Sequence, residues 1–448
     1  MFKSIFVPWH QTLVVAILIA SAALPRSAAA QDPEAPPALF RDMAPATAAA
    51  ADLPPNEDPT VARSRFVELR ADVLTSRVVD PTADMPETAP VTLDLFDDVR
   101  VVLLKDQVER LDDSTMSWTG YVEGDENPTA AIIISRDSDG IDSLTGNVVV
   151  GGTLFQLRSV GGAVHEIREI DQDKFPDEAE PTAPELPLLG EAAPEADEAL
   201  DEPPTDDGGE ITVLVLFTAR VEREVRDIES KIRLAVLETN QSYVASGIRQ
   251  RIRLVHSQKV DYTESGNVFT GRERLRIRGD GKLDIAHTLR DQHAADVVSL
   301  WIARGNACGV AYIMEEVRPD FSPFGFSVVR EDCATGYYSF GHELGHIMGA
   351  RHDRVVDPTD GRPFQFNHGF FRTQPTDASC VPWRTIMGYN DGCDDVNVRC
   401  TRQKFWSNAD RSYCGDRTGV NRGHPAAADN RETLNLTART VAGFRPRG

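Results

Sequence analysis

Hydrophobic residues are spaced differently in the two halves of the chain. Between residues 64 and 170, apolar residues form short runs separated by glycines or acidic pairs, which is typical of β-strands joined by tight turns. Residues 91–104, for example, predict two strands on either side of Asp97 and Asp98. The first half is therefore predicted to be mostly β, with further strands at 130–135 and 146–157.

From residue 211 onward, strand-like runs alternate with segments of helical spacing. Residues 211–217 are almost continuously apolar and predict a buried strand. Apolar residues then recur every three or four positions from Val221 to Ala235, which predicts a helix ending near Gly247. This alternation predicts an α/β (α+β) domain with a mixed sheet. Further strands are predicted at 251–257, 296–302, 309–314 and 326–329, and further helices at 283–289, 335–349 and 430–441.

The first thirty residues have the features of an export signal. Lys3 is followed by an apolar run at 13–20, and three alanines at 28–30 form a small-residue cleavage site. The apolar run is shorter than the length that spans a bilayer, although an uncleaved membrane anchor is the alternative. We therefore expect a secreted protein with a signal peptide at 1–30 and no stable membrane association.

The distribution of charged residues changes at the same place in the chain as the spacing of hydrophobic residues. Residues 1–210 carry 14 basic and 41 acidic side chains, a net charge of −27. Residues 211–448 carry 33 basic and 29 acidic side chains, a net charge of +4. Opposite net charges suggest two parts that attract each other. The single histidine at 64–170, His165, is expected to lie on the surface.

Cysteine usage agrees with export. The chain has six cysteines, all in its second half, and an even number in an exported chain indicates three disulfides. A cysteine-based metal site is disfavoured because the sequence has no C-x-x-C pair. The cysteines are Cys308, Cys333, Cys380, Cys393, Cys400 and Cys414.

One short segment carries the residues of a metal site. His342 and His346 are four residues apart, so on a helix they share a face and can bind one ion together. Gly349 can adopt a positive φ and end the helix, after which the chain can return with His352 as a third ligand. Three neutral imidazoles suit one Zn²⁺ ion and leave a fourth position open, as in catalytic zinc sites. Glu343 is then placed to act as a general base.

The segment from His342 to His352 follows the pattern H-E-x-x-H-x-x-G-x-x-H, and Met387 in the turn 384–389 follows as a Met-turn, which together are the metzincin signature. The second half resembles the reprolysin-like metzincins, and within them most closely the bacterial peptidyl-Asp metalloendopeptidases. The resemblance spans essentially residues 211–446. It is carried by ETNQSY (238–243), YTESGN (262–267), ADVVSLW (295–301), CGVAY (308–312), CATGYYSFGHELGHIMGARHDR (333–354), RTIMGY (384–389), WSN (406–408) and ADN (428–430).

The resemblance implies a zinc endopeptidase that acts on protein or peptide substrates and prefers to cleave on the amino side of Asp. It implies that Met387 forms an apolar floor under the zinc ion and that Tyr389 donates a hydrogen bond to the oxyanion, with packing as the alternative for Tyr389. Asp353 is expected to have a structural role. Cys380 and Cys414 are additional to the family's pattern, and the segment from Asp391 to Arg402 is long for it. Both departures flank the expected specificity pocket.

The domains expected on this basis are a signal peptide at 1–30, a disordered spacer at 31–60, a β-rich pro-region at 61–170, an exposed acidic and Pro-rich linker at 171–209, and the catalytic domain at 210–448. Cys308 and Cys333 flank the chain that leads to the zinc helix, and we expect them to pair. The other four cysteines allow three connectivities, of which we favour Cys393–Cys400 and Cys380–Cys414.

Latency is expected to come from the acidic pro-region. Residues 1–307 contain no cysteine, so a pro-region thiolate cannot silence the metal. A pro-region carboxylate could instead occupy the open metal position or an Arg-lined pocket. The alternative is that the pro-region only assists folding. We expect no nucleic-acid partner.

Two alternative functions remain. The first is a zinc endopeptidase of broad or different specificity. The second is a non-catalytic secreted binding protein on the same scaffold, which is disfavoured because the chain keeps Glu343 and all three histidines.

Overall fold

The computed structural model describes residues 36–43, 58–73, 90–125, 129–186, 209–359 and 361–445. All of them belong to one compact unit, Pro36–Gly448. The expected signal peptide at 1–30 lies outside the described residues, as does most of the expected spacer at 31–60. Among the helices that the structure describes, none has the length and apolar character needed to cross a bilayer.

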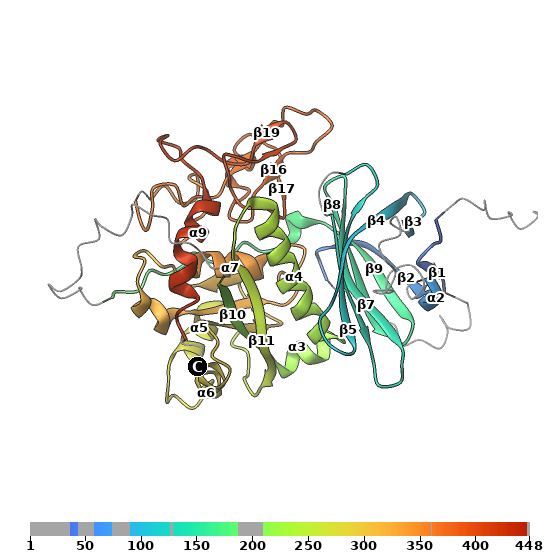
Figure 1. Ribbon diagram of the computed structural model, residues 1–448, viewed down its shortest axis with the longest axis horizontal. Helices are drawn as coiled ribbons and strands as arrows, with labels where there is room; N and C mark the ends of the chain where they lie inside the picture. Colours follow the sequence, from blue (N-terminus) through green and yellow to red (C-terminus); the bar gives the residue numbers. More distant parts are fainter. Residues whose placement is uncertain are drawn as a thin grey trace, which may run out of the picture. The chain divides into compact units, whose positions relative to one another are not determined.

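The β-rich first half is a nine-stranded antiparallel sheet (Figure 1). From β3 to β9, each strand pairs with the next one along the chain, beginning with the predicted pair around Asp97 and Asp98. A bridge between Ala38 and Thr92 also ties the segment before β1 to β3 around an apolar core. The elements are β1 (Phe40–Asp42), β2 (Val61–Leu69), the short helix α2 (Ala71–Val73), β3 (Val91–Phe96), β4 (Val99–Arg110), β5 (Thr115–Val122), β6 (Ala130–Arg136), β7 (Asp142–Val150), β8 (Thr153–Gly161) and β9 (Val164–Ile170).

The structure differs from expectation at two places in this half. Part of the expected spacer is strand β1, because pairing with β2 buries Phe40 in the core. His165 is buried rather than exposed, and its Nε2 accepts a hydrogen bond from the Leu144 amide at 2.9 Å. Burial lowers the pKa of His165 to about 4. A neutral imidazole is the form that a buried site favours.

The second half contains the predicted mixed sheet, in the order β11-β10-β12-β14-β13. β13 is antiparallel to β14, and the other pairs are parallel. Alternate residues of β10 face two apolar layers, one shared with α4, α7 and α9, the other with α5 and α6. The elements are β10 (Glu210–Thr218), α3 (Ala219–Glu224), α4 (Ile228–Ser246), β11 (Arg251–Val260), α5 (Val268–Arg276), α6 (Ile285–Gln292), β12 (Val297–Ile302), β13 (Gly309–Ala311), η3 (Pro319–Phe324), β14 (Phe326–Arg330), α7 (Ser339–Ile347) and α9 (Asn430–Val441).

The helix predicted from Val221 to Gly247 is two helices. The side chain of Asp227 accepts a hydrogen bond from the Ser230 amide and starts α4 as a new helix. Gly247 ends α4 with a φ of 75°, as the sequence predicts. The helix predicted at 335–349 is shorter and begins only at Ser339, because Tyr338 before it has a φ of 66°.

The expected exposed linker at 171–209 is only partly described, and its described part is exposed at some residues and buried at others. After η2 (Gln172–Lys174), Phe175 is buried and stacks on Tyr337 with ring centroids 4.4 Å apart. Glu178 and Ala179 are also buried. Backbone pairing and aromatic packing have outweighed the acidic, Pro-rich composition that predicted exposure. Residues 187–208 lie outside the described residues.

After α7 the chain forms mostly loops with short paired segments. The disulfides of the second half are Cys308–Cys333, which precedes α7, and Cys380–Cys414 and Cys393–Cys400, which follow it. They are the same pairs that the sequence favours. Cys308–Cys333 closes a sequence separation of 25 residues, which stabilises by roughly 3 kcal/mol in the chain-entropy view. The short elements are β15 (Phe371–Arg372), β16 (Trp383–Arg384), α8 (Asp391–Asp394), β17 (Thr401–Arg402), β18 (Ser412–Tyr413) and β19 (Asp416–Arg417).

Candidate metal centre and active site

Helix α7 holds two of the three predicted ligands and is packed into the core. Leu344 and Ile347 belong to the apolar layer beneath the sheet. A side chain at Gly345 would place its Cβ 2.7 Å from Trp406 and 3.2 Å from the sulfur of Met387. Glycine therefore allows α7 to lie directly against both residues, and Met387 is fully buried at this contact.

The chain reverses directly after α7 and returns the third histidine. Gly349 has a φ of 86°, which glycine adopts without strain, and its amide donates to the His346 carbonyl at 2.8 Å. His352 follows three residues later. The carboxylate of Asp353 then accepts a hydrogen bond from the Tyr389 amide at 2.8 Å. Asp353 thereby joins the loop that carries His352 to the turn that carries Met387.

The three histidines converge on one point. Their Nε2 atoms lie 3.1 Å apart in every pair, and all three side chains are fully buried. Among the described residues, they are the one group of three or more His, Cys, Asp or Glu able to hold a metal ion. Nitrogens bound to one tetrahedral Zn²⁺ ion at about 2.0–2.1 Å would be roughly 3.3 Å apart, close to the spacing found.

Hydrogen bonds at the far side of the rings fix their orientation. His342 Nδ1 lies 3.0 Å from the Ile386 carbonyl, and His346 Nδ1 lies 2.8 Å from the Ala350 carbonyl. A carbonyl can only accept, so Nδ1 carries the proton and each Nε2 presents a lone pair. Burial lowers the pKa of both histidines well below the usual range, so both rings are neutral. Converging lone pairs repel one another unless a cation lies between them, so the residues fit a metal ion.

Glu343 lies beside this cluster without a hydrogen-bond partner. It is fully buried, and neither carboxylate oxygen has a partner among the described residues. A Cβ at Gly309 would come within 2.4 Å of its Oε1, so glycine at the start of β13 makes room for the carboxylate. Burial first, and then the charge of Glu178, raise the pKa of Glu343 well above its usual range. A buried unpartnered carboxylate costs stability, which points to a role in chemistry.

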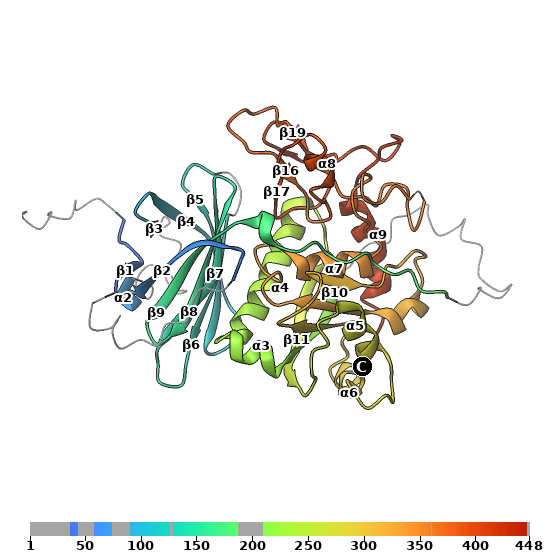
Figure 2. The ribbon, with the colours of Figure 1, turned by 180° about the vertical axis from the view of Figure 1, so that it is seen from behind.

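The segment after η2 pairs with β13 beside the cluster. The Ala179 amide donates to the Gly309 carbonyl at 2.9 Å, and the Cys308 amide donates to the Asp177 carbonyl at 2.9 Å. Thr182 forms a parallel bridge with Tyr312. Figure 2 shows this segment as an extended green chain crossing in front of α7. We call residues 177–182 the cleft segment.

Tyr389 contacts both the cluster and the cleft segment. Its ring meets the His352 ring edge-on, with centroids 4.3 Å apart, and its hydroxyl donates to the Glu178 carbonyl at 3.2 Å. Glu180 Oε1 lies 3.5 Å from His352 Nδ1. The hydroxyl of Tyr389 can therefore hold a peptide carbonyl oxygen next to the histidines.

A buried ion pair between Glu178 and Arg402 lies beside Tyr389, and no local sequence pattern indicates it. Glu178 Oε1 accepts from Arg402 Nη1 at 2.7 Å, and both side chains are fully buried. Ser339 Oγ also donates to Glu178 Oε1, at 2.7 Å. The opposite net charges of the two halves suggested such a contact, but no local pattern distinguishes these residues from the other acids and arginines.

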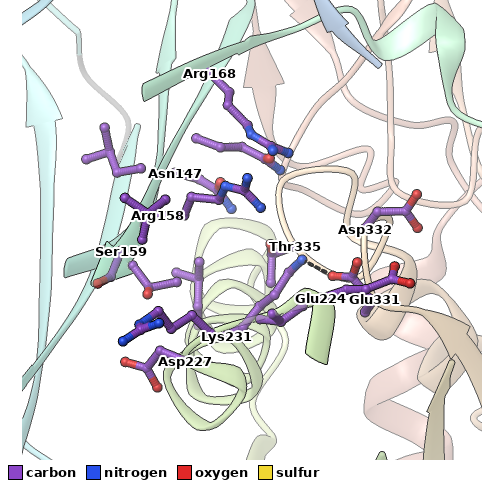
Figure 3. A pocket seen from close by; sticks show the side chains of 18 of the residues that line it. Asn147, Arg158, Ser159, Arg168, Glu224, Asp227, Lys231, Glu331, Asp332 and Thr335 are labelled. Carbon is purple, nitrogen blue, oxygen red and sulfur yellow. Dashed lines mark hydrogen bonds and ion pairs between the residues drawn. The ribbon is translucent and has the colours of Figure 1, made fainter. Parts of the chain in front are cut away.

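A separate cavity lies away from the histidines. It has a volume of about 270 Å³ and is lined by the first sheet and by residues around α3 and α4. Its charged side chains are drawn in Figure 3, where Lys231 forms an ion pair with Glu331. None of the three histidines lines it. The cavity therefore offers no group to the site described above.

Comparisons of the sequence with known proteins point to one group. A sequence model of Metallo-peptidase family M12 matches residues 208–403. The peptidyl-Asp metalloendopeptidase of Stenotrophomonas maltophilia is 33% identical over 424 residues, which are 89% of this chain and 95% of that protein. The protein of the same name from Xanthomonas campestris is 32% identical over 322 residues, 71% of each chain. The crystal structure of metalloproteinase-II from Bacteroides fragilis aligns with a TM-score of 0.39 and 12% identity, over 63% of this chain and 85% of that one.

Proposed function

Because the chain belongs to metallopeptidase family M12, among the peptidyl-Asp metalloendopeptidases, we propose that it is a secreted zinc endopeptidase made as a latent precursor. The observation that carries the proposal is the convergence of three buried histidines beside an unpartnered buried carboxylate, Glu343. The signal peptide proposed at 1–30 would export it. Preference for Asp on the carboxyl side of the cleaved bond is proposed from the names of its relatives.

The residues have distinct roles in this proposal. His342, His346 and His352 would hold the zinc ion, which when bound polarises the peptide carbonyl and lowers the pKa of water. Glu343 accepts the proton of the attacking water and delivers it to the leaving amine. The Tyr389 hydroxyl donates to the carbonyl oxygen as negative charge develops there.

Digestion of a mixed peptide library by the matured enzyme tests the function. Cleavage is expected on the amino side of Asp, with loss of activity in a chelator and recovery on adding Zn²⁺. Cleavage that continues unchanged in the chelator would reject the metal mechanism. Metal-dependent cleavage without enrichment of Asp would favour the alternative of broad specificity.

Latency is proposed to come from the cleft segment, which covers β13 and contacts Tyr389. A separately made segment 31–207 is expected to inhibit the matured enzyme at micromolar concentration. Salt should weaken the inhibition only in part. The half-buried Arg233–Asp112 pair and the exposed Arg399–Asp173 pair are reached by solvent and are screened, whereas the buried Arg402–Glu178 pair is screened much less. Absence of inhibition at low salt would leave folding assistance as the role of the pro-region.

Replacing Tyr389 with phenylalanine separates its two candidate roles. The ring contact with His352 remains in Tyr389→Phe, and only the hydroxyl is lost. If the hydroxyl supports the oxyanion, kcat should fall by about 100-fold with unchanged zinc content, since one such donor contributes on this scale. A kcat equal to that of the wild type would assign Tyr389 to packing.

A further inference from the structure

We propose that Arg402 is the residue that recognises the carboxylate of the substrate, and that Glu178 of the precursor occupies the same position as an internal substrate mimic. The inference rests on the proposed preference for Asp and names the residues responsible for it.

Arg402 is buried, and its own domain accepts hydrogen bonds from only part of its guanidinium. Its Nη1 donates to the Tyr337 carbonyl at 3.0 Å, and its guanidinium lies 4.1 Å from the centroid of the Tyr337 ring. Its Nε and Nη2 are buried without a partner among the described residues. Glu178 therefore uses one donor of a guanidinium that can bind a carboxylate through two. Unsatisfied donors in a buried site favour an anionic ligand.

Arg384 shows how a structural arginine in the same region differs. Its Nε donates to the Cys400 carbonyl at 3.0 Å and its Nη1 to the Gly388 carbonyl at 2.6 Å. Its Nη2 donates to the Tyr337 hydroxyl at 3.0 Å. All three nitrogens of Arg384 thus bind groups of the catalytic domain, whereas two of the three nitrogens of Arg402 have no partner among the described residues.

The carboxylate of Glu178 contacts Arg402 as the carboxylate of a substrate Asp is proposed to do. The backbone carbonyl of Glu178 accepts from the Tyr389 hydroxyl, and its side chain reaches Arg402 and Ser339. In a substrate cleaved before Asp, the carbonyl that Tyr389 holds would belong to the residue that precedes Asp. Glu178 instead offers its own carbonyl, so its backbone is placed differently from that of a substrate, and the likeness lies in the carboxylate on Arg402. Glu178 Oε2 has no hydrogen-bond partner among the described residues, so the match is incomplete. The side chain of glutamate is one methylene longer than that of aspartate. Glu178 therefore occupies the site but fits it less well than the Asp of a substrate would.

The position of Arg402 keeps the guanidinium fixed relative to the metal ligands. It belongs to β17, which pairs with β16, and follows the Cys393–Cys400 disulfide by two residues. Ser339, on the other side of the Glu178 carboxylate, begins the helix that carries His342 and His346. The carboxylate site and the histidine cluster are thus connected through α7.

The first test compares matured enzymes prepared from full-length chains. The substrates are two peptides that differ only in Asp or Asn after the cleaved bond. Wild type is expected to favour the Asp peptide by about 100-fold or more in kcat/KM, because a site built for a polar group rejects the analogue that lacks it. In Arg402→Gln this ratio should fall below about 10-fold through loss on the Asp peptide alone. Arg399→Gln removes an equal charge from an exposed side chain of the same region and should behave as wild type.

The outcomes separate the inference from the proposed function. A wild-type preference for Asp that survives in Arg402→Gln overturns the inference and leaves the proposed function intact. A wild type without any preference for Asp rejects the proposed specificity and the inference with it. If Arg402→Gln is not secreted, Arg402→Lys takes its place, because lysine keeps the charge but not the paired donors. An unchanged ratio in Arg402→Lys also overturns the inference.

The second test changes only the precursor segment. Glu178→Gln removes the charge that Arg402 binds, and Glu185→Gln removes the charge of an exposed residue farther along the same segment. Hydrolysis of the Asp peptide by freshly purified full-length precursor is measured. Glu178→Gln is expected to raise its initial rate by at least about 10-fold, because losing one partner of a buried charge pair weakens docking on this scale or more, and Glu185→Gln should match wild type. Equal latency in both variants would overturn the role of Glu178 as a mimic.

Discussion

The Glu343→Ala enzyme is expected to bind its metal and to lose nearly all turnover. Glu343 is not among the three converging ligands, so its removal leaves the hydrogen bonds that orient His342 and His346 in place. General acid–base catalysis by one positioned side chain contributes about 10²–10⁴-fold, and Glu343 is proposed to move the proton in both directions. We therefore expect kcat to fall by about 1,000-fold or more.

Metal content and kcat measured on the same preparation check this result. Glu343→Gln is the matched companion, since it keeps the volume that packs against Gly309 and loses only the basic oxygen. Both variants should retain metal and lose activity. Stability should not fall in Glu343→Gln, because the carboxylate it replaces is buried without a partner. Hydrolysis by Glu343→Ala at the wild-type rate would show that the mechanism is wrong.

The second large effect is expected from His346→Ala, which should lose both metal and activity. Two buried histidines remain, and they leave two of the four positions of a tetrahedral site without a protein ligand. Because metal binding stabilises only the folded chain, the melting temperature of the variant should also stop responding to added Zn²⁺.

His424→Ala is the matched control, because His424 is exposed and lies outside the cluster. It should bind metal and cleave peptides as the wild type does. Wild-type metal content in His346→Ala would exclude His346 as a ligand, whatever its activity.

The parts of the molecule that local patterns encode could be predicted from the sequence. The mixed sheet, α9 and the segment around His342 follow from spacing, and Gly349 was predicted to end its helix because glycine tolerates a positive φ. The Cys308–Cys333 pair followed from the position of both residues near that helix. Each of these features depends on residues close together in sequence.

The parts that long-range contacts encode could not be predicted. Residues 171–186 are acidic and Pro-rich, which is the composition of an exposed chain, yet pairing with β13 buries Glu178 and Ala179. Arg402 is one of 33 basic residues in the second half, and its sequence neighbours give no sign that its side chain is buried. His165 was misjudged for the same reason, since a distant backbone amide satisfies its ring.

The pairing of the cleft segment with β13 has a consequence for the behaviour of the enzyme in concentrated solution. Once this segment leaves, the carbonyls of Gly309 and Ala311 lose the amides of Ala179 and Thr182, and an unpaired strand edge is a template for self-association. β13 has only three residues, and short edge strands are a common protection against such aggregation. Because β13 is short, an extended peptide forms few backbone hydrogen bonds with it. The time that such a peptide stays bound therefore depends mainly on its side chains.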